Sequence, residues 1–418
     1  MLLMVCAISC SQTFTQQNAD AVYVSNIKTV KLFQQNNQES LPVLQLNSTD
    51  IIELHFDDLD GYVKNYYYTF VLCNADWQLA DVSPFDYLKG YQIQRITQYR
   101  NSSIAQTNYI HYQAQLPESS CVPTKSGNYL LKVFLNGDIN QLAFTKKFFV
   151  VERRAVVAAT ISQTFDSEKF STHQKLKLKI ILPDKELFNV QQQVKLIVTQ
   201  NNRTDNAYIN IQPTFIRGNE LEYDSENELI FEGGNEYRWA DLRSFRFLSE
   251  RIDKIIQPNS VYLKPDVNRL QQRYLYMKDL NGYYDISTTE SVNPWWQTEY
   301  GKVYFTYVPP NNKPYTNTNV YLLGELTNNE IGDTSKMIFN EEKGVYEKEL
   351  YLKQGYYSYT YITKNNNDKQ ANASFTLTEK NYWETENDYQ IFVYFRPLNA
   401  RHDELIALTV FNSRNGRL

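Results

Sequence analysis

Acidic, basic and aromatic side chains lie close together in the segment GGNEYRWADLRSFRF, residues 233–247. Glu236 and Asp241 can exchange protons with a substrate, whereas Arg238 and Arg243 can bind an anion or pair with a carboxylate. This combination is compatible with catalysis, with ligand binding, or with a turn that ion pairs hold in place. The choice depends on the chemistry and the structural elements of the rest of the chain.

Carboxylates also occupy every second position just before this segment. Alternate side chains of a β-strand share one face, so the pattern predicts either an acidic stripe or a calcium site. The stretch lacks the residue order of an EF-hand loop, and we therefore favour a solvated acidic edge, which also discourages edge-to-edge aggregation. The residues are Glu220, Glu222, Asp224, Glu226 and Glu228.

The sequence shows no recognisable set of catalytic or metal-binding residues. The four histidines are far apart in the sequence, and none belongs to a paired ligand motif such as H-E-x-x-H. A G-x-S-x-G elbow and a phosphate-binding loop are also missing from the sequence. We therefore predict that the protein is not an enzyme and needs no cofactor or metal. The histidines are His55, His111, His173 and His402.

The composition favours β-structure. The chain of 418 residues contains 33 tyrosines and 22 phenylalanines, and aromatic residues suit the pleated, half-buried surface of a sheet. The formal net charge of -5 comes from 42 basic and 47 acidic residues that are spread along the chain. No basic block is available to neutralise a phosphate backbone, so nucleic acid is not an expected partner.

Short β-rich runs separated by Asn, Asp, Gly, Ser and Pro predict an all-β protein of three consecutive immunoglobulin-like or early-set-like β-sandwich domains. We place their boundaries at residues 18–153, 154–310 and 311–418. In the second domain, Lys175, Lys177 and Lys179 alternate with apolar residues, which predicts a strand with one buried and one solvated face. Tyr357, Tyr359 and Tyr361 would likewise share one face of a strand in the third domain.

The three tyrosines can form part of a core or stack on sugar rings, and we favour the core. Carbohydrate binding nevertheless remains the alternative function for this chain, because the third domain is rich in aromatics. The aromatic set also includes Tyr356, Tyr382 and Trp383.

The N-terminal sequence MLLMVCAISCSQTFTQQ has the apolar segment and polar boundary of a secretory signal, which we assign to residues 1–17. A basic segment usually precedes such an apolar run, so we expect the true signal to begin upstream. The sequence leaves two alternatives for its processing, cleavage after Ser11 or lipidation of Cys10. In the body of the chain, Cys73 and Cys121 either form a disulfide or stay as two buried thiols.

Several long segments resemble the plug protein family of the type IX secretion system of Bacteroidota. They include YYYTFVLCNADW, PTFIRGNELEYDSENELIFEGGNEYRWADLRSFRFLSERI, LYMKDLNGYY and NYWETENDYQIFVYFRP, and the similarity extends in order from about Ala21 to Leu408. The resemblance implies a non-enzymatic protein, peripheral to the inner face of the outer membrane. It would close the periplasmic opening of the translocon β-barrel while that channel is idle.

The segment that best marks this family contains Arg217, Gly218, Asn219, Glu220, Gly233, Gly234, Asn235, Glu236, Arg238, Asp241 and Arg243. Since no nucleophile or metal cluster accompanies it, we interpret the segment as structural. Gly233 and Gly234 would permit a tight turn. Glu236 or Asp241 would pair with one of the neighbouring arginines Arg238, Arg243 or Arg246.

The third domain resembles, more weakly, the glycogen-binding-type early-set domains. It has Gly324 in VYLLGELTNNE, but the tryptophan that follows in that family is missing, as is a second sugar-stacking tryptophan after GYYSYTYI. The resemblance therefore supports the fold and not sugar binding.

Overall fold

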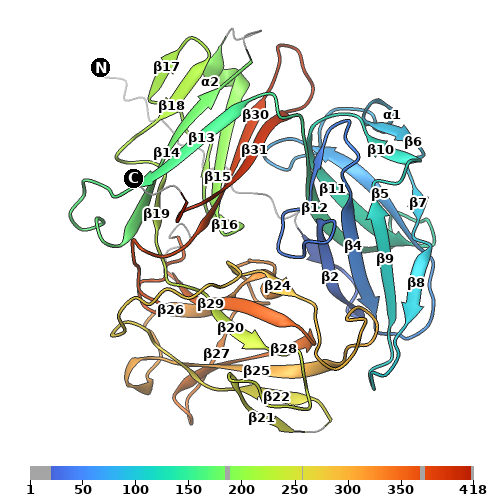
Figure 1. Ribbon diagram of the computed structural model, residues 1–418, viewed down its shortest axis with the longest axis vertical. Helices are drawn as coiled ribbons and strands as arrows, with labels where there is room; N and C mark the ends of the chain where they lie inside the picture. Colours follow the sequence, from blue (N-terminus) through green and yellow to red (C-terminus); the bar gives the residue numbers. More distant parts are fainter. Residues whose placement is uncertain (1–19, 184–188, 257, 368–371, 416–418) are drawn as a thin grey trace, which may run out of the picture.

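The computed structural model describes residues 20–183, 189–256, 258–367 and 372–415. The predicted signal segment and Cys10 lie outside the described residues. Figure 1 shows three groups of strands arranged around a common centre, with two very short helices, so the all-β sandwich class is confirmed.

The first sandwich comprises the N-terminal strands. One sheet has the order β1-β12-β11-β5-β7 with β3 beside β12, and the facing sheet has the order β2-β4-β9-β8. Alternating burial along these strands encloses a core that includes Phe56, Tyr66 and Phe144. The elements are β1 (Ala21–Val22), β2 (Ile27–Gln34), β3 (Val43–Gln45), β4 (Ile52–Asp58), β5 (Tyr66–Cys73), α1 (Pro84–Tyr87), β6 (Leu88–Gly90), β7 (Gln94–Arg95), β8 (Gln98–Asn101), β9 (Ile110–Leu116), β10 (Cys121–Pro123), β11 (Gly127–Leu135) and β12 (Leu142–Val151).

The second sandwich combines the middle of the chain with its C-terminal end. Its sheets have the orders β13-β14-β18-β17, with β19 beside β14, and β16-β15-β30-β31. The elements are β13 (Val156–Ser162), β14 (His173–Ile181), α2 (Val190–Gln193), β15 (Val194–Gln200), β16 (Arg203–Ile209), β17 (Phe215–Arg217), β18 (Glu220–Tyr223), β19 (Ile230–Glu232), β30 (Asp388–Phe395) and β31 (Glu404–Asn412).

The third sandwich is formed by the chain between β19 and β30. Its sheets have the orders β20-β29-β24, with β26 beside β29, and β21-β22-β25-β28-β27, with β23 beside β25. The elements are β20 (Arg238–Asp241), β21 (Ile252–Ile256), β22 (Ser260–Leu263), β23 (Asp266–Val267), β24 (Tyr284–Asp285), β25 (Tyr300–Val308), η2 (Pro310–Asn312), β26 (Thr318–Leu323), η3 (Glu325–Thr327), β27 (Ile338–Asn340), β28 (Val345–Lys353) and β29 (Tyr356–Asn365).

This pairing corrects the predicted boundary between residues 310 and 311. Strand β25 ends just before that boundary and pairs along its length with β28 beyond it, so both belong to one sheet. Strand β15 pairs with β30, almost two hundred positions later. The third sandwich is thus inserted into the second. Regularly spaced strands identify sandwiches, but strand spacing carries no information on which strands pair.

The lysine and carboxylate stripes of the second sandwich face each other, because β14 pairs with β18. Lys175 bonds both Asp224 and Glu226, and its side chain is only 1% exposed. Lys179 bonds Glu220 at 2.7 Å. The predicted solvated lysine face is confirmed at Lys177 and Lys179, whose side chains are 32% and 45% exposed, and is wrong at Lys175, which is buried. The predicted acidic edge is corrected, because β18 lies inside the sheet and ends at Tyr223, so that Asp224, Glu226 and Glu228 follow it in the connection to β19.

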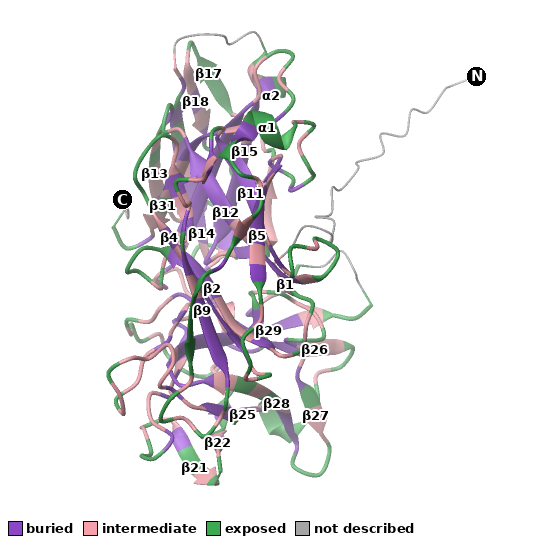
Figure 2. Ribbon diagram, turned by 90° about the vertical axis from the view of Figure 1, so that its right-hand side faces the viewer, coloured by how far each residue is buried: buried purple, intermediate pink, exposed green. Residues whose placement is uncertain are grey.

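The core interpretation of the alternating tyrosines is confirmed. Tyr357, Tyr359 and Tyr361 are all fully buried inside the third sandwich. Figure 2 shows that the buried residues lie mainly on the inner strands of the sandwiches, while many of the exposed residues lie in the connecting loops.

The inserted arrangement makes a direct prediction about truncation. A chain that ends at residue 310 lacks β26 to β31 and therefore loses sheet partners from both the second and the third sandwich. We expect limited proteolysis of the truncated chain to leave one resistant fragment, residues 20–153, whereas the full-length chain should resist cleavage throughout. A second resistant fragment spanning residues 154–310 would contradict the insertion.

Candidate functional site

The family segment GGNEYRWADLRSFRF is the passage by which the chain leaves the second sandwich and enters the third. It begins after β19 and includes β20, which pairs with β29. The returning passage, between β29 and β30, lies directly against it. A Cβ added to Gly233 would lie 2.0 Å from the carbonyl oxygen of Tyr382, and Gly234 has a φ of +64°. The glycines are needed because the two passages approach so closely.

Hydrogen bonds clamp the two passages together. The Gly234 amide donates to Asn381 Oδ1 at 2.9 Å, and the Tyr382 amide donates to the Gly234 carbonyl at 2.9 Å. The Asn387 side chain donates to the Gly233 carbonyl at 2.9 Å. Asn235, the next residue, donates to the carbonyl of Glu379 at 3.0 Å. Both chain crossings between the sandwiches thus form a single hydrogen-bonded unit.

Arg238 is the charged centre of this unit. Its Nε and Nη2 donate to the two carboxylate oxygens of Glu379 at 2.8 and 3.0 Å, and its Nη1 donates to Asp266 at 2.9 Å. Tyr359 and Tyr361 donate to the other oxygen of Asp266 at 2.8 and 2.9 Å. All five residues are buried.

The two carboxylates outweigh the cost of burying the Arg238 guanidinium, so the pKa of Arg238 is raised. Additional arginines contact the same acids, Arg251 at Asp266 and Arg269 at Glu379. The network joins β20, β23, β29 and the return passage, which are widely separated in the sequence.

Among the described residues Glu236 forms no ion pair with an arginine, so of the two acids expected to pair with Arg238, Arg243 or Arg246 it is not the one that does. Its Oε1 accepts hydrogen bonds from the Tyr274 hydroxyl and from the Glu386 amide, while Oε2 is buried with no hydrogen-bond partner in the part of the chain that the structure describes. Burial raises the pKa of Glu236 to about 7. Burial, with Glu236 nearby, also raises the pKa of Asp279 to about 8.

The alternative acid, Asp241, does pair with one of the three arginines. Arg243 bonds Asp241 through two contacts of 2.8 and 2.7 Å at the partly exposed end of the segment. Arg246 lies 3.7 Å from Glu290 instead.

The earlier part of the family pattern, residues 217–220, belongs to a different place. It forms the hairpin turn between β17 and β18, where Gly218 has a φ of +62° and Arg217 and Glu220 are paired across the strands. Asn219 donates from its side chain to the Leu182 carbonyl at 2.8 Å. This group shapes an exposed turn of the second sandwich and does not join the Arg238 network.

A second buried polar group joins the first and third sandwiches, and it was missed by sequence reasoning. His111 Nδ1 lies 2.7 Å from Asp57 Oδ1, and His55 Nδ1 lies 3.0 Å from His111 Nε2. Lys353 of the third sandwich donates to Asp57 Oδ2 at 2.6 Å, and the ring of Trp295 stacks on His55 with centroids 3.8 Å apart.

The two histidines come together because β4 pairs with β9, which sets Asp57 opposite His111. The sequence offered one sign of this buried group: His55 and Asp57 lie two positions apart on one predicted strand and so share a face. Burial lowers the pKa of His111 to about 4, so the imidazole is neutral at pH 7. The Asp–His–His series resembles a proton relay, but Asp57, His111 and Lys353 are all at most 1% exposed, so a substrate has no access to them. We interpret this group as structural.

The described part of the chain holds no group of His, Cys, Asp or Glu residues that could bind a metal ion. No helix among the described residues is long and apolar enough to cross a membrane.

Comparison with known proteins agrees with the resemblance in the sequence. The family described as type 9 secretion system plug protein, first domain, matches residues 27–152, the extent of the first sandwich. The chain belongs to the type 9 secretion system plug protein family. A search of curated proteins found no match.

Two solved structures were compared with this plug family member. A hypothetical protein from Parabacteroides merdae ATCC 43184 is 33% identical, with a TM-score of 0.89, and the alignment covers 94% of this chain and 99% of that protein. Trypsin-activated alpha-2-macroglobulin from Escherichia coli aligns at 10% identity over 92% of this chain and 28% of its own length, but the TM-score of 0.16 is too low to indicate a shared fold. The similarity to the first protein therefore extends over all three sandwiches.

The cysteines of this plug family member do not form a disulfide in the structure. Cys73 and Cys121 are both free and buried, so of the two alternatives, a disulfide or two buried thiols, the structure shows the buried thiols. Burial raises the pKa of each thiol to about 12, which disfavours the reactive thiolate.

Substitution of Arg238 tests the buried network. Arg238→Met leaves Glu379 and Asp266 buried without their main cation, and breaking a buried pair typically costs about 3–5 kcal/mol. We expect the free energy of unfolding in urea to fall by about this amount. The matched control is Arg243→Met in the same segment, whose partly exposed pair is worth about 0–1 kcal/mol. Equal losses for the two variants would contradict the assignment.

The raised pKa of Glu236 predicts a pH dependence of stability. Between the ordinary value of 4.5 and about 7, the unfolded chain ionises while the folded carboxyl keeps its proton, so stability falls as the pH rises through this window. Glu236→Gln removes this loss, and relative to wild type it should gain about 3 kcal/mol between pH 4.5 and pH 8. Urea unfolding at both pH values measures the gain. The exposed control Glu342→Gln should show no such gain.

Proposed function

We propose that this protein closes the periplasmic opening of the outer-membrane translocon β-barrel of the type IX secretion system while the channel is idle, and that it does so without catalysis. Membership of the plug family carries this proposal. The same membership supports a location in the periplasm, at the inner face of the outer membrane. The barrel itself is then the partner, and neither a small-molecule substrate nor nucleic acid is required.

The physical requirement for a plug is a broad body that keeps its shape. Three sandwiches that moved independently would leave gaps around a wide pore. In this chain the second and third sandwiches share two clamped crossings around Arg238, and the first is tied to the third through Lys353 and Asp57. Lys31 adds a further tie, since its ammonium lies 2.9 Å from Glu325. Buried ion pairs of this kind resist separation, because separating the domains breaks the pairs.

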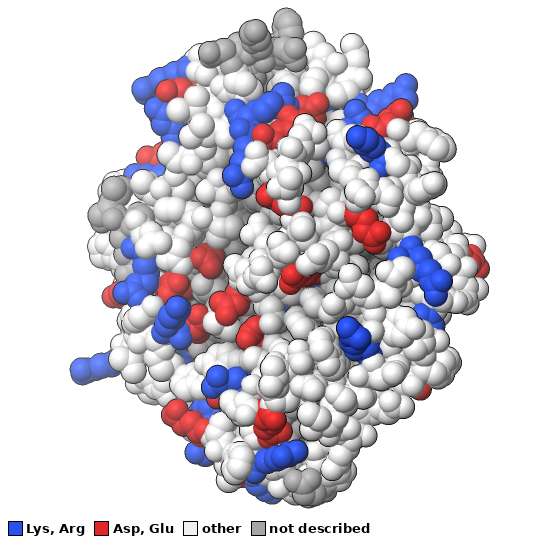
Figure 3. Space-filling model, turned by 45° about the vertical axis from the view of Figure 1, so that its right-hand side comes forward, with Lys and Arg blue, Asp and Glu red and all other residues white. Residues whose placement is uncertain are grey.

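The surface also suits a reversible protein contact. Figure 3 shows Lys and Arg interspersed with Asp and Glu on the face in view, among broad areas without charge. The face in view has no continuous basic stripe that could follow a nucleic-acid backbone. Tyr357, Tyr359 and Tyr361, for which sugar stacking was the alternative to a place in the core, are fully buried, which weakens the case for carbohydrate binding.

A permeability experiment tests the proposed function. Deleting the gene should make the outer membrane leaky to a large antibiotic such as vancomycin, because an idle barrel would stand open. Deleting the translocon as well should restore the barrier, and supplying the wild-type plug should restore it in the single deletion. The tagged protein should also co-purify with the barrel from detergent-solubilised envelopes. An intact barrier in the single deletion would refute the proposal.

A further inference from the structure

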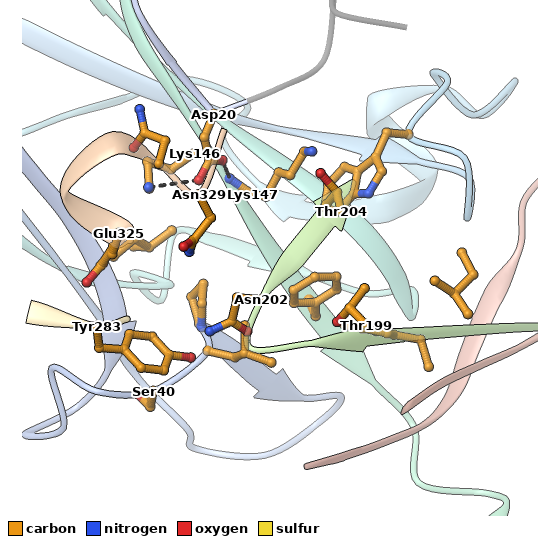
Figure 4. A pocket seen from close by; sticks show the side chains of 18 of the residues that line it. Asp20, Ser40, Lys146, Lys147, Thr199, Asn202, Thr204, Tyr283, Glu325 and Asn329 are labelled. Atoms are coloured by element: carbon orange, nitrogen blue, oxygen red, sulfur yellow. Dashed lines mark hydrogen bonds and ion pairs between the residues drawn. The ribbon is translucent and has the colours of Figure 1, made fainter. Parts of the chain in front are cut away.

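A cavity of about 170 Å³ lies where the three sandwiches meet. Its lining comes from the first sandwich through β12 and the loop before β3, from the second through β15, β16 and β30, and from the third through η3 and the residue before β24. Figure 4 shows side chains from these separate elements pointing toward one space. Domain junctions are a preferred location for ligand sites in proteins.

One side of the cavity is apolar and rich in aromatic rings. Trp77, Phe149 and Phe392 line it together with Ile197. The rings of Phe149 and Phe392 lie 5.0 Å apart, and Trp77 meets Phe149 edge-on at 5.6 Å. The volume is close to that of engineered apolar cavities of about 150 Å³ that bind benzene, so one aromatic ring fits.

The opposite side carries two carboxamides with unsatisfied oxygens. Asn202 Oδ1 and Asn329 Oδ1 are both buried and accept no hydrogen bond from the described residues, although the Asn202 side chain also contacts the Tyr283 hydroxyl. Figure 4 places Asn202 and Asn329 on the same side of the cavity as Tyr283. Leaving a buried polar atom unpaired is costly, so these positions favour a ligand that can hydrogen-bond with them. A carboxamide can turn over to present its NH₂ group, so an amide ligand, which both donates and accepts, suits either orientation.

The charged groups that line the cavity already have partners in the protein. Lys146 bonds Asp20 at 2.8 Å, Glu325 bonds Lys31, and the ammonium of Lys147 lies 4.6 Å from the Trp77 ring centre. Two cations and two carboxylates therefore belong to the lining itself, which favours a neutral ligand over an ion.

We propose that this cavity binds a neutral aromatic amide, with the ring against Trp77, Phe149 and Phe392 and the amide group hydrogen-bonded to Asn202 and Asn329. This chemistry is found in a free aromatic amide and in an aromatic residue within a polypeptide. The site does not depend on the proposed plugging of a translocon. A ligand held there would contact all three sandwiches at once.

The first test is titration of the full chain with N-acetyl-L-phenylalaninamide by calorimetry and by saturation-transfer NMR. We expect saturable binding at millimolar concentration and reduced hydrogen exchange in residues 197–204. N-acetylglycinamide, which lacks the ring, should not bind. The peptide N-acetyl-Ala-Phe-Ala-amide separates the two sources: tighter binding than the single residue indicates a polypeptide, and weaker binding indicates a free compound.

Two variants remove the carboxamides without disturbing the backbone. Asn202 and Asn329 have φ values of 58° and 51°, which glycine adopts freely, so Asn202→Gly and Asn329→Gly should fold. Each should bind N-acetyl-L-phenylalaninamide at least about tenfold more weakly, as expected for a lost hydrogen bond. The matched control is Asn136→Gly, an exposed asparagine with a φ of 55° away from the cavity.

The proposal is overturned if the wild-type chain shows no saturable binding of N-acetyl-L-phenylalaninamide. It is also overturned if both glycine variants bind as tightly as the wild type and the Asn136→Gly control. Since neither result concerns the translocon, failure here leaves the permeability experiment as a separate test of the proposed function.

Discussion

The bidentate contact between Arg238 and Glu379 is the interaction on which the architecture depends. Arg238 opens the third sandwich and Glu379 closes it, so the pair joins the two ends of an inserted domain. Neither side chain is accessible enough for water to replace the partner. An inserted domain whose two crossings were free would hinge about them. The buried pair prevents this, because separation would leave uncompensated charges in a low-dielectric interior.

The residues around this pair follow from the same constraint. Asp266 supplies the second negative charge that Arg238 can bind, and the hydroxyls of Tyr359 and Tyr361 complete its hydrogen bonds. The tyrosines therefore have two roles, an apolar ring in the core and a polar tip on a buried carboxylate. The close passage at Gly233 brings the return strand near enough for the network to form.

The junction between the first and third sandwiches uses the same device with different residues. Lys353 and Asp57 form the charged pair, and the neutral imidazole of His111 hydrogen-bonds to the other carboxylate oxygen of Asp57. A neutral His111 avoids adding a second buried cation beside Lys353. Both of these junctions place ionic contacts where the chain crosses or where domains meet, whereas the first and second sandwiches meet through an apolar cluster that includes Phe149, Ile197 and Phe392. Such a distribution gives a body of three domains with fixed mutual positions.

The sequence by itself determined the fold class, the family and the core character of Tyr357, Tyr359 and Tyr361. These depend on local properties: residue type, a period of two, and long segments shared with relatives. The local Asp241–Arg243 pair was one of several pairings that the sequence left open. The tight turn expected at Gly233 and Gly234 is instead an irregular passage that lies against Tyr382 and Phe375. Only the tertiary structure decided that the third sandwich is inserted into the second, that Glu236 stays without an arginine, and that Arg238 binds Glu379. It also decided that Lys175 is buried against Asp224, and that His55 and His111 meet. Each of these depends on which strands pair, and strand pairing is set by contacts between distant segments that leave no periodic signal in the chain.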